Sequence, residues 1–411
     1  MYFKNAYRGF LLTKINKFGG DGEMKKKLLV FLSAVMMTSA FAGCEAKASG
    51  KDSDTVKVGL NYELSGAAAT YGQSIVSGIE LAFEEINKDG GVLGKQIEAV
   101  KVDNKSENAE SANLATKLAT KDKVVAILGP ATSGNTKAAA VAATTNKVPL
   151  LSASATADDA TLDKNGKVLD YVFKTCFSDS FQGVIMGQFA AGDLGKKNAA
   201  ILMDSGSDYS KGLTKSFKET FTSKGGKIVT EEAYAAKQTD FKAVLTNIKS
   251  SGAEVVYVPG YYEEVGLIVK QARELGITAP IIGGDGYDSP KLSELAGANA
   301  LNNVFYTNHY SSMDTTPEVV KFKDAYKAKY NKDADAFSAL GYDLAYFLVD
   351  SLKRAGEVNS DKLKTALAET KDFKGITGQF SMDENHTPLK AITILEVKNG
   401  ETTFLKKLDP K

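Results

Sequence analysis

Two turns rich in hydroxyl side chains contain residue types that could bind an anion. The first, residues 129–136, reads GPATSGNT and follows an apolar run at 124–128. The second, residues 152–156, reads SASAT and follows a similar run at 148–151. Small residues, hydroxyls and free backbone N–H groups at a helix start favour an anion, because the helix dipole places positive partial charge there. We therefore predict that both turns open helices and together form a cradle for a carboxylate.

The first turn also has the glycine spacing of a phosphate-binding loop. Gly129 and Gly134 fit G-x-x-x-x-G, and Thr136 stands where a magnesium-binding hydroxyl would be. Asn135 replaces the lysine that neutralises phosphate charge in such loops, which argues against a nucleotide. A plain helix N-cap without a ligand is the alternative for this turn alone. The presence of the second turn favours a ligand.

The N-terminal part has the pattern of an export signal. Residues 24–43 contain three consecutive lysines, then an apolar stretch, then small residues that end before Cys44. The apolar stretch is too short for a membrane span, so these residues are interpreted as a secretory signal peptide. We interpret residues 1–23 as an upstream extension and residues 44–54 as a flexible tether.

The position of Cys44 resembles the lipobox of bacterial lipoproteins, in which cleavage exposes a cysteine that is then lipidated. Phe41 departs from the usual leucine of that motif. We predict an exported protein, anchored by lipid on Cys44 to the outer face of the cytoplasmic membrane or located in the periplasm. Ordinary signal cleavage near Ala42, with Cys44 incidental, is the alternative.

Charge and residue counts exclude several classes of function. Residues 1–43 carry seven of the 51 Lys and Arg and two of the 50 Asp and Glu, so the remaining chain has a net charge of −4. Nucleic acid is therefore not an expected partner. Beside Cys44 only Cys176 remains, so no internal disulfide is expected, and Cys176 is interpreted as a small buried residue. With two histidines and no H-E-x-x-H, C-x-x-C or G-x-S-x-G motif, we expect no enzyme activity, cofactor or metal site.

Short β-branched runs alternate with amphipathic helical patterns from residue 56 onward. One such series runs to residue 151 and a second from 199 to 283, and strands return near 376–380 and 391–396. This alternation is typical of doubly wound parallel sheets, and two series predict two α/β lobes.

Ligands bind outside the carboxyl ends of the strands in such sheets. Residues that could contact a ligand follow the predicted strands at that edge: Tyr71, Ser133, Ser154, Thr156, Tyr209, Tyr261 and Asp285. Hydroxyls come mostly from the first series, and aromatic rings with one carboxylate come mostly from the second. An amino acid with an apolar side chain fits this division.

At these residues the chain resembles the leucine/isoleucine/valine type of ABC-transporter substrate-binding proteins, which have the type I periplasmic binding protein fold. The resemblance covers the chain from about residue 56 to its end. It rests on motifs that are specific only in combination: LSG at 64–66 with YG at 71–72, INKDGG at 86–91, GP at 129–130 with Ser133, SASAT at 152–156, DYSKG at 208–212 and GGDG at 283–286.

The resemblance implies a role for each candidate residue. The ligand carboxylate falls to Ser133, Ser154 and Thr156, and the ligand ammonium falls to Asp285, where family members often carry the longer glutamate. Tyr71, Tyr209 and Tyr261 match positions at which the family places pocket side chains. The resemblance therefore implies that these three rings contact the remaining part of the ligand, its side chain. Tyr262 is an open alternative to Tyr261 as the inward residue.

The resemblance also implies two lobes that close on the ligand through a three-crossover hinge. Lobe 1 is expected to comprise residues 55–175 plus 308–380, and lobe 2 residues 176–307 plus 381–411. The crossovers are expected near residues 174–177, 304–308 and 380–383. The implied partners are a small-molecule ligand such as leucine, isoleucine or valine and the subunits of an ABC permease, with the protein itself a monomer.

Ligand identity stays open at this point. The family also contains receptors for amides, urea and small carboxylates, and the same fold occurs in sensors as well as in uptake. The export signal favours uptake, because cytoplasmic sensors lack one. An exported enzyme would need an acid, base or nucleophile set that the sequence does not show.

Overall fold

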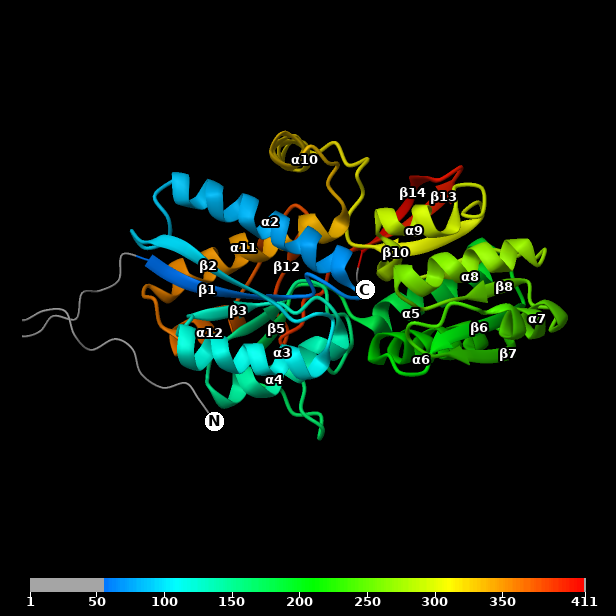
Figure 1. Cartoon of the computed structure of the whole chain (residues 1–411), viewed down its shortest axis with the longest axis horizontal. Coiled ribbons are helices and arrows are strands. Elements are labelled where there is room, and N and C mark those ends of the chain that lie inside the picture. Colours follow the sequence, from blue (N-terminus) through cyan, green and yellow to red (C-terminus); the bar gives the residue numbers. More distant parts are fainter. Residues whose placement is uncertain (1–54, 410–411) are drawn as a thin grey trace, which may run out of the picture. The chain divides into compact units, whose positions relative to one another are not determined.

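The computed structural model describes residues 55–409. The predicted signal peptide, the tether and Cys44 lie outside the described residues. The described part contains two lobes, each built on its own sheet with helices packed against it (Figure 1), which confirms the predicted fold class. None of its helices is long and apolar enough to cross a membrane.

The first lobe is built on five parallel strands in the order β2-β1-β3-β4-β5. Their bounds are β1 Thr55–Tyr62, β2 Gln96–Asp103, β3 Ala126–Leu128, β4 Leu150–Ser152 and β5 Val172–Lys174. The helices that connect the first four of them are α2 Ala69–Lys88, α3 Asn108–Lys117 and α4 Ser133–Thr145. All side chains of β3, β4 and β5 are buried, as expected for a sheet covered on both faces.

The second lobe is built on seven strands in the order β14-β13-β10-β9-β8-β6-β7. Its parallel strands are β6 Asn198–Asp204, β7 Lys227–Tyr234, β8 Val255–Tyr257, β9 Ile281–Gly283 and β10 Val304–Asn308. Two antiparallel strands complete its edge, β13 Ile392–Lys398 and β14 Glu401–Leu408. Its helices are α5 Asp179–Gln188, α6 Asp208–Ser223, α7 Lys242–Ser250, α8 Tyr262–Glu274 and α9 Pro290–Ala296.

The segment between β10 and β13 packs on the first lobe. It contains α10 Pro317–Tyr330, α11 Ala336–Ala355, α12 Ser360–Ala368, β11 Phe373–Gly375 and β12 Gly378–Phe380. Figure 1 shows α11 (orange) beside α2 (blue). The chain therefore passes between the lobes after β5, after β10 and after β12. Asn308 is the last residue of β10 in the second sheet, so we propose that the second crossover begins after it and not within residues 304–308.

Two glycines allow α2 and α11 to pack at close range. A Cβ atom on Gly341 would lie 2.1 Å from the Ile75 carbonyl oxygen, and one on Gly78 would lie 2.0 Å from the Ser338 carbonyl oxygen. Helix α2 contributes Ile75 and Ile79 to the core, and α11 is buried along most of its length. The first lobe thus depends on a backbone contact that no side chain can enter.

Replacing Gly341 with alanine is expected to lower the free energy of unfolding by roughly 1–3 kcal/mol, because an added methyl group must push the two helices apart. Urea denaturation measures the loss. The matched control is Gly192→Ala, since Gly192 is exposed and a Cβ there would meet open space. Equal effects of the two substitutions would contradict the close helix contact.

Candidate functional site

The first hydroxyl-rich turn joins β3 to α4. Backbone N–H groups of this turn donate hydrogen bonds to a buried acidic side chain, that of Glu63. The Glu63 carboxylate accepts hydrogen bonds from the N–H groups of Ala131 and Thr132 at 2.9 and 3.1 Å. It also accepts from the Thr132 hydroxyl at 2.9 Å and from the Asn135 amide at 2.8 Å. The prediction of free backbone N–H groups is therefore wrong at these two residues, because the chain supplies its own anion.

The second turn follows β4 but does not open a helix, which corrects the prediction. The next helix in the described chain is α5, which begins at Asp179. The Ser152 hydroxyl accepts a hydrogen bond from the backbone N–H of Ala155 at 3.0 Å and so closes a local turn. Small polar residues mark a helix start only when an apolar stripe at helical spacing follows, and residues 157–171 lack one.

The two turns contact each other through their hydroxyl groups. The Ser154 hydroxyl donates to the carbonyl oxygen of Ala131 at 2.8 Å, and the Ser133 hydroxyl accepts from the backbone N–H of Ala157 at 3.2 Å. The Thr156 hydroxyl is buried and faces the carboxyl group of Asp179. Burial raises the pKa of Asp179 well above its usual range, and the hydrogen bond from Thr156 opposes that rise. A ligand that reached Thr156 would take the place of this contact.

Asp285, which belongs to the second lobe, is the second residue after β9, with only 3% of its surface exposed. Its carboxylate accepts hydrogen bonds from the Tyr209 hydroxyl at 2.8 Å and from the Gln182 amide at 3.1 Å. Its second oxygen lies 3.1 Å from Nε2 of His309. An ionised carboxylate can accept about four hydrogen bonds, so one acceptor position remains for a cationic ligand group.

Tyr71 reaches from α2 of the first lobe to the second lobe. Its hydroxyl donates to the carbonyl oxygen of Gly286 at 2.5 Å and accepts from the backbone N–H of Tyr262 at 3.2 Å. Its ring centroid lies 5.7 Å from that of Tyr261 and 4.3 Å from that of Phe337. The site therefore contains direct bonds between the lobes.

Burial sets the protonation of the polar rings in this region. It raises the pKa values of Tyr71, Tyr209 and Tyr261 well above the ordinary tyrosine value, so these phenols stay neutral donors. Burial lowers the pKa of His309, so its imidazole is neutral near pH 7. Burial also raises the pKa of the Cys176 thiol to about 12, which fits the interpretation of that residue as an unreactive buried side chain.

Five of the seven predicted contact residues line one small cavity. Its lining consists of Tyr71, Ala131, Thr132, Ser154, Tyr209, Tyr261, Asp285, Gly286 and Phe337. Of the two alternatives, Tyr261 lines the cavity and Tyr262 does not. The ring of Tyr261 stacks on that of Tyr209, with ring centroids 4.9 Å apart. Ser133 and Thr156 lie in the two adjoining turns but outside the lining.

Sequence reasoning missed four residues of this region. Phe337 opens the long apolar helix α11 and was indistinguishable from a core residue, because its periodicity is that of the core stripe. Glu63 and Gln182 carry no motif that separates them from ordinary polar residues. His309 had one available signal, since it is one of two histidines and directly follows a strand of the second sheet.

The family described as periplasmic binding protein matches residues 55–402. The chain belongs to the periplasmic binding protein family. The Leu/Ile/Val-binding protein BraC3 of Rhizobium johnstonii is 32% identical to it over 330 residues, which cover 80% of this chain and 88% of that protein.

Solved structures of this family extend the comparison. The branched-chain amino acid transporter substrate-binding protein LivJ of Streptococcus pneumoniae, solved with isoleucine, has a TM-score of 0.82 and 42% identity and covers 87% of this chain and 100% of its own. A solute-binding protein of an R. palustris ABC transporter, solved with benzoate, has a TM-score of 0.77 and 26% identity and covers 87% of this chain and 97% of its own. These relatives are solute-binding transport proteins and not enzymes.

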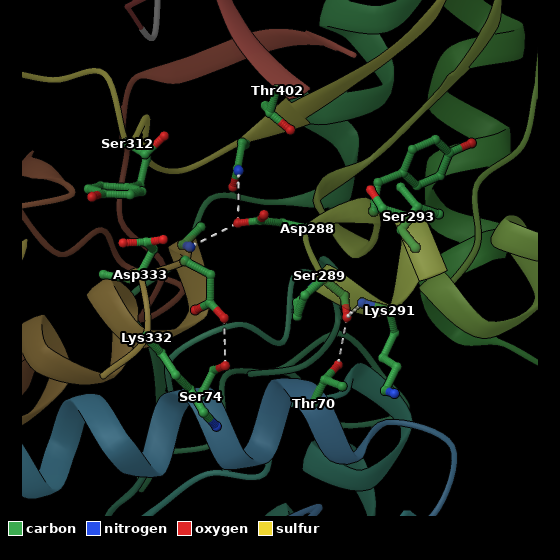
Figure 2. A pocket seen from close by; sticks show the side chains of 18 of the residues that line it. Thr70, Ser74, Asp288, Ser289, Lys291, Ser293, Ser312, Lys332, Asp333 and Thr402 are labelled. Atoms are coloured by element: carbon green, nitrogen blue, oxygen red, sulfur yellow. Dashed lines mark hydrogen bonds between the residues drawn. The ribbon is translucent and has the colours of Figure 1, made fainter. Parts of the chain in front are cut away.

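This periplasmic binding protein also has a larger cavity of about 730 Å³ (Figure 2). At its wall, Thr70 of α2 and Ser289 share a hydrogen bond between hydroxyl oxygens 3.0 Å apart. Asp288 accepts from the Asn308 amide at 3.1 Å and from the backbone N–H of Ala336 at 2.8 Å. Polar and apolar groups both line this cavity, and one of its carboxylates, that of Asp288, links β10 to the start of α11.

Asp288 is expected to make the stability of the protein depend on pH. Burial, followed by the charge of Asp335, raises the pKa of Asp288 to about 6. Protonated Asp288 therefore stabilises the fold fully below about pH 4, and this contribution is lost as the pH rises through about 6. Asp288→Asn should raise the free energy of unfolding at pH 7.5 by about 1–3 kcal/mol and leave it unchanged near pH 4.

Denaturation at the two pH values checks this expectation. The control is Asp333→Asn, because the Asp333 side chain is 91% exposed in the same cavity wall. A gain for Asp288→Asn that is the same at both pH values would contradict the assigned titration.

Proposed function

We propose that this protein captures a branched-chain or other apolar amino acid between its lobes and delivers it to an ABC permease in the membrane. The observation that carries the proposal is the small cavity at which Tyr71 and Ser154 of the first lobe meet Tyr209, Tyr261 and Asp285 of the second. The names of the relatives support it, since BraC3 is a Leu/Ile/Val-binding protein and LivJ was solved with isoleucine.

The ligand carboxylate is assigned to the two hydroxyl-rich turns. The Ser133 hydroxyl accepts a bond from the N–H of Ala157, so its own proton can be donated to the ligand. The Thr156 hydroxyl can exchange its contact with Asp179 for one to the ligand. Ser154 completes the set once its bond to Ala131 is exchanged for one to the ligand. Hydrogen bonds to a charged group are roughly twice as strong as neutral ones, which favours this exchange.

The ligand ammonium is assigned to Asp285 and the aliphatic side chain to the aromatic rings. Asp285 retains one acceptor position, and it is buried. Tyr71, Tyr261 and Phe337 present ring faces and edges to the same cavity. Burial of a leucine-sized side chain there stabilises the complex by about 1.5–3 kcal/mol.

Binding requires the lobes to separate and close again. The cavity has a volume of about 10 Å³, roughly the space of one water molecule. An amino acid can enter only if the bonds of Tyr71 to Gly286 and Tyr262 break, and the three crossovers are where the backbone would bend. Closure then excludes water and strengthens each polar contact to the ligand.

A thermal-shift screen of the purified protein tests this function. The panel contains the twenty amino acids together with benzoate, acetamide and urea. A ligand that binds only the folded state raises the melting temperature, by an amount set by its concentration relative to Kd. We expect the largest shifts with leucine, isoleucine and valine, and the absence of a shift with every amino acid would overturn the proposal.

A receptor for a carboxylate or amide that lacks an ammonium group is the second candidate. It is favoured by the bonds of Asp285, whose two oxygens already accept hydrogen bonds from neutral side chains of the protein. The relative solved with benzoate shows that a protein with this fold can bind such an acid. Shifts with benzoate or acetamide alone would select this candidate, in uptake or in sensing.

Lipid anchoring through Cys44 is part of the proposed function. Cys44→Ser is expected to move the protein from the membrane fraction to the soluble fraction, because no acyl chain can then be attached. Cell fractionation with immunodetection measures the shift, and leucine affinity should not change. Cys176→Ser is the matched control and should stay with the membrane. Retention of the Cys44→Ser protein in the membrane fraction would refute the anchor.

A further inference from the structure

The residues at the end of β10 bond to the side chains that surround the proposed ammonium site. The Thr307 hydroxyl donates to Oε1 of Gln182 at 2.5 Å. His309 is the first residue after β10, and its Nε2 lies 3.1 Å from the carboxylate of Asp285. The second crossover therefore begins with direct contacts to Asp285 and its partner Gln182.

The ring of His309 also contacts the first crossover. It stacks on Phe177, with ring centroids 3.5 Å apart and an angle of 14° between the planes. Phe177 lies between β5 and α5, where the chain leaves the first sheet. The imidazole of His309 therefore contacts the first crossover through Phe177 and the carboxylate of Asp285, and it belongs to the second crossover itself.

The hydrogen-bond pattern determines which nitrogen of His309 carries the proton. Nδ1 is buried without a partner among the described residues, so a proton there would leave a buried donor unsatisfied. A proton on Nε2 is satisfied by the carboxylate. The orientation of the Gln182 amide is determined by a similar argument. The backbone N–H of Asp285 can only donate, so it must face Oε1 of Gln182, which leaves the NH₂ group of Gln182 to face the Asp285 carboxylate. Both neighbours therefore present N–H groups to Asp285.

We propose that His309 is a positioning residue that holds the Asp285 carboxylate for the ligand ammonium and, through its stack on Phe177, links that carboxylate to the hinge. This inference rests on the proposed function. It predicts that the imidazole contributes to affinity through Nε2–H, and that a side chain of similar shape without this donor does not replace it.

Calorimetric titration of the full-length protein and its variants with leucine tests the inference. His309→Phe keeps a ring that can stack on Phe177 but removes the donor, and it should weaken leucine binding at least about tenfold. His309→Gln restores a neutral N–H donor and should recover most of the affinity. His309→Met replaces the phenylalanine variant if that protein does not fold.

The second histidine provides the matched control. His386 stacks on Phe173 with ring centroids 4.1 Å apart, and its Nδ1 lies 2.9 Å from the carbonyl oxygen of Val172. It has a similar aromatic environment but no bond to Asp285. His386→Phe should therefore leave leucine affinity within about threefold of wild type, whereas a general loss of packing would affect both histidine variants alike.

Imidazole NMR adds a signal that a purely structural role would not change. The chain has two histidines, so the His386→Phe variant assigns both sets of ring signals. The Nε2 signal of His309 should show a protonated, hydrogen-bonded nitrogen and should shift when leucine is added. In Asp285→Ala this signal should move to the position of an unbonded ring and no longer respond to leucine.

The outcomes separate this inference from the proposed function. Wild-type protein that binds leucine, with His309→Phe weakened and His309→Gln recovered, supports the inference. Equal leucine affinity of wild type and His309→Phe overturns the inference alone and leaves the proposed function standing. Wild-type protein that binds no amino acid overturns both.

Discussion

Replacing Asp285 with alanine is expected to weaken leucine binding by about 1.5–3 kcal/mol, which corresponds to roughly 10–150-fold in Kd. Asp285 is the only carboxylate in the lining of the small cavity, and the ammonium of an amino acid would lose its charged partner. Tyr209, Gln182 and His309 would also lose their common acceptor, so the remaining site would present donors to a cation. Calorimetric titration measures the change.

Two controls separate the loss of the carboxylate from damage to the fold. The melting temperature of Asp285→Ala without ligand should stay within a few degrees of wild type. 4-Methylpentanoate, which is leucine without its amino group, should bind the variant at least as well as it binds wild type. Unchanged leucine affinity in a folded Asp285→Ala protein would remove Asp285 from the site.

Replacing Glu63 with alanine is expected to lower the free energy of unfolding by about 3–5 kcal/mol. The buried Glu63 carboxylate accepts four hydrogen bonds from the turn after β3, and each donor left without an acceptor costs about 1–3 kcal/mol. Some of these donors can reach water after the substitution, which keeps the total below the sum. Urea denaturation measures the loss.

Glu63→Gln is the matched variant. Its amide oxygen can still accept from two donors, whereas its NH₂ group meets donors where an acceptor is needed. Its stability should therefore lie between those of wild type and Glu63→Ala. A Glu63→Ala protein within 1 kcal/mol of wild type would show that the carboxylate does not hold this turn.

The fold was predictable because the periodicity of apolar residues is strong in this chain. Alternating strands and helices indicated two doubly wound lobes, and the structure confirms both sheets. The strand ends were less predictable: the runs expected at 124–128 and 148–151 shorten to β3 and β4, of three residues each. The apolar residues left over stand before these strands, and Val125 still donates its N–H to the Lys57 carbonyl oxygen at 2.9 Å, so hydropathy alone does not locate where an assigned strand begins.

The candidate site was predictable to the extent that topology determines it. Residues that follow parallel strands must gather at one sheet edge, and Ser154, Tyr209, Tyr261 and Asp285 do so in one cavity. Tyr71 reaches the same cavity from the first turns of α2. The shared edge does not determine which of these side chains face the cavity.

The partners of the site residues could not be predicted, because they come from tertiary contacts between distant segments. Glu63 is 68 residues from Ala131, and Gln182 is 103 residues from Asp285. The helix expected after residues 152–156 is absent because its composition matched a helix start while the following residues lacked an apolar stripe.

Calorimetric titration of the wild-type protein with leucine and with 4-methylpentanoate tests the central claim most directly. The two molecules share a carboxylate and an aliphatic chain and differ in the ammonium group that Asp285 is proposed to bind. We expect leucine to bind at least about tenfold more tightly than 4-methylpentanoate. Equal affinities, or tighter binding of 4-methylpentanoate, would contradict an amino-acid site built around Asp285.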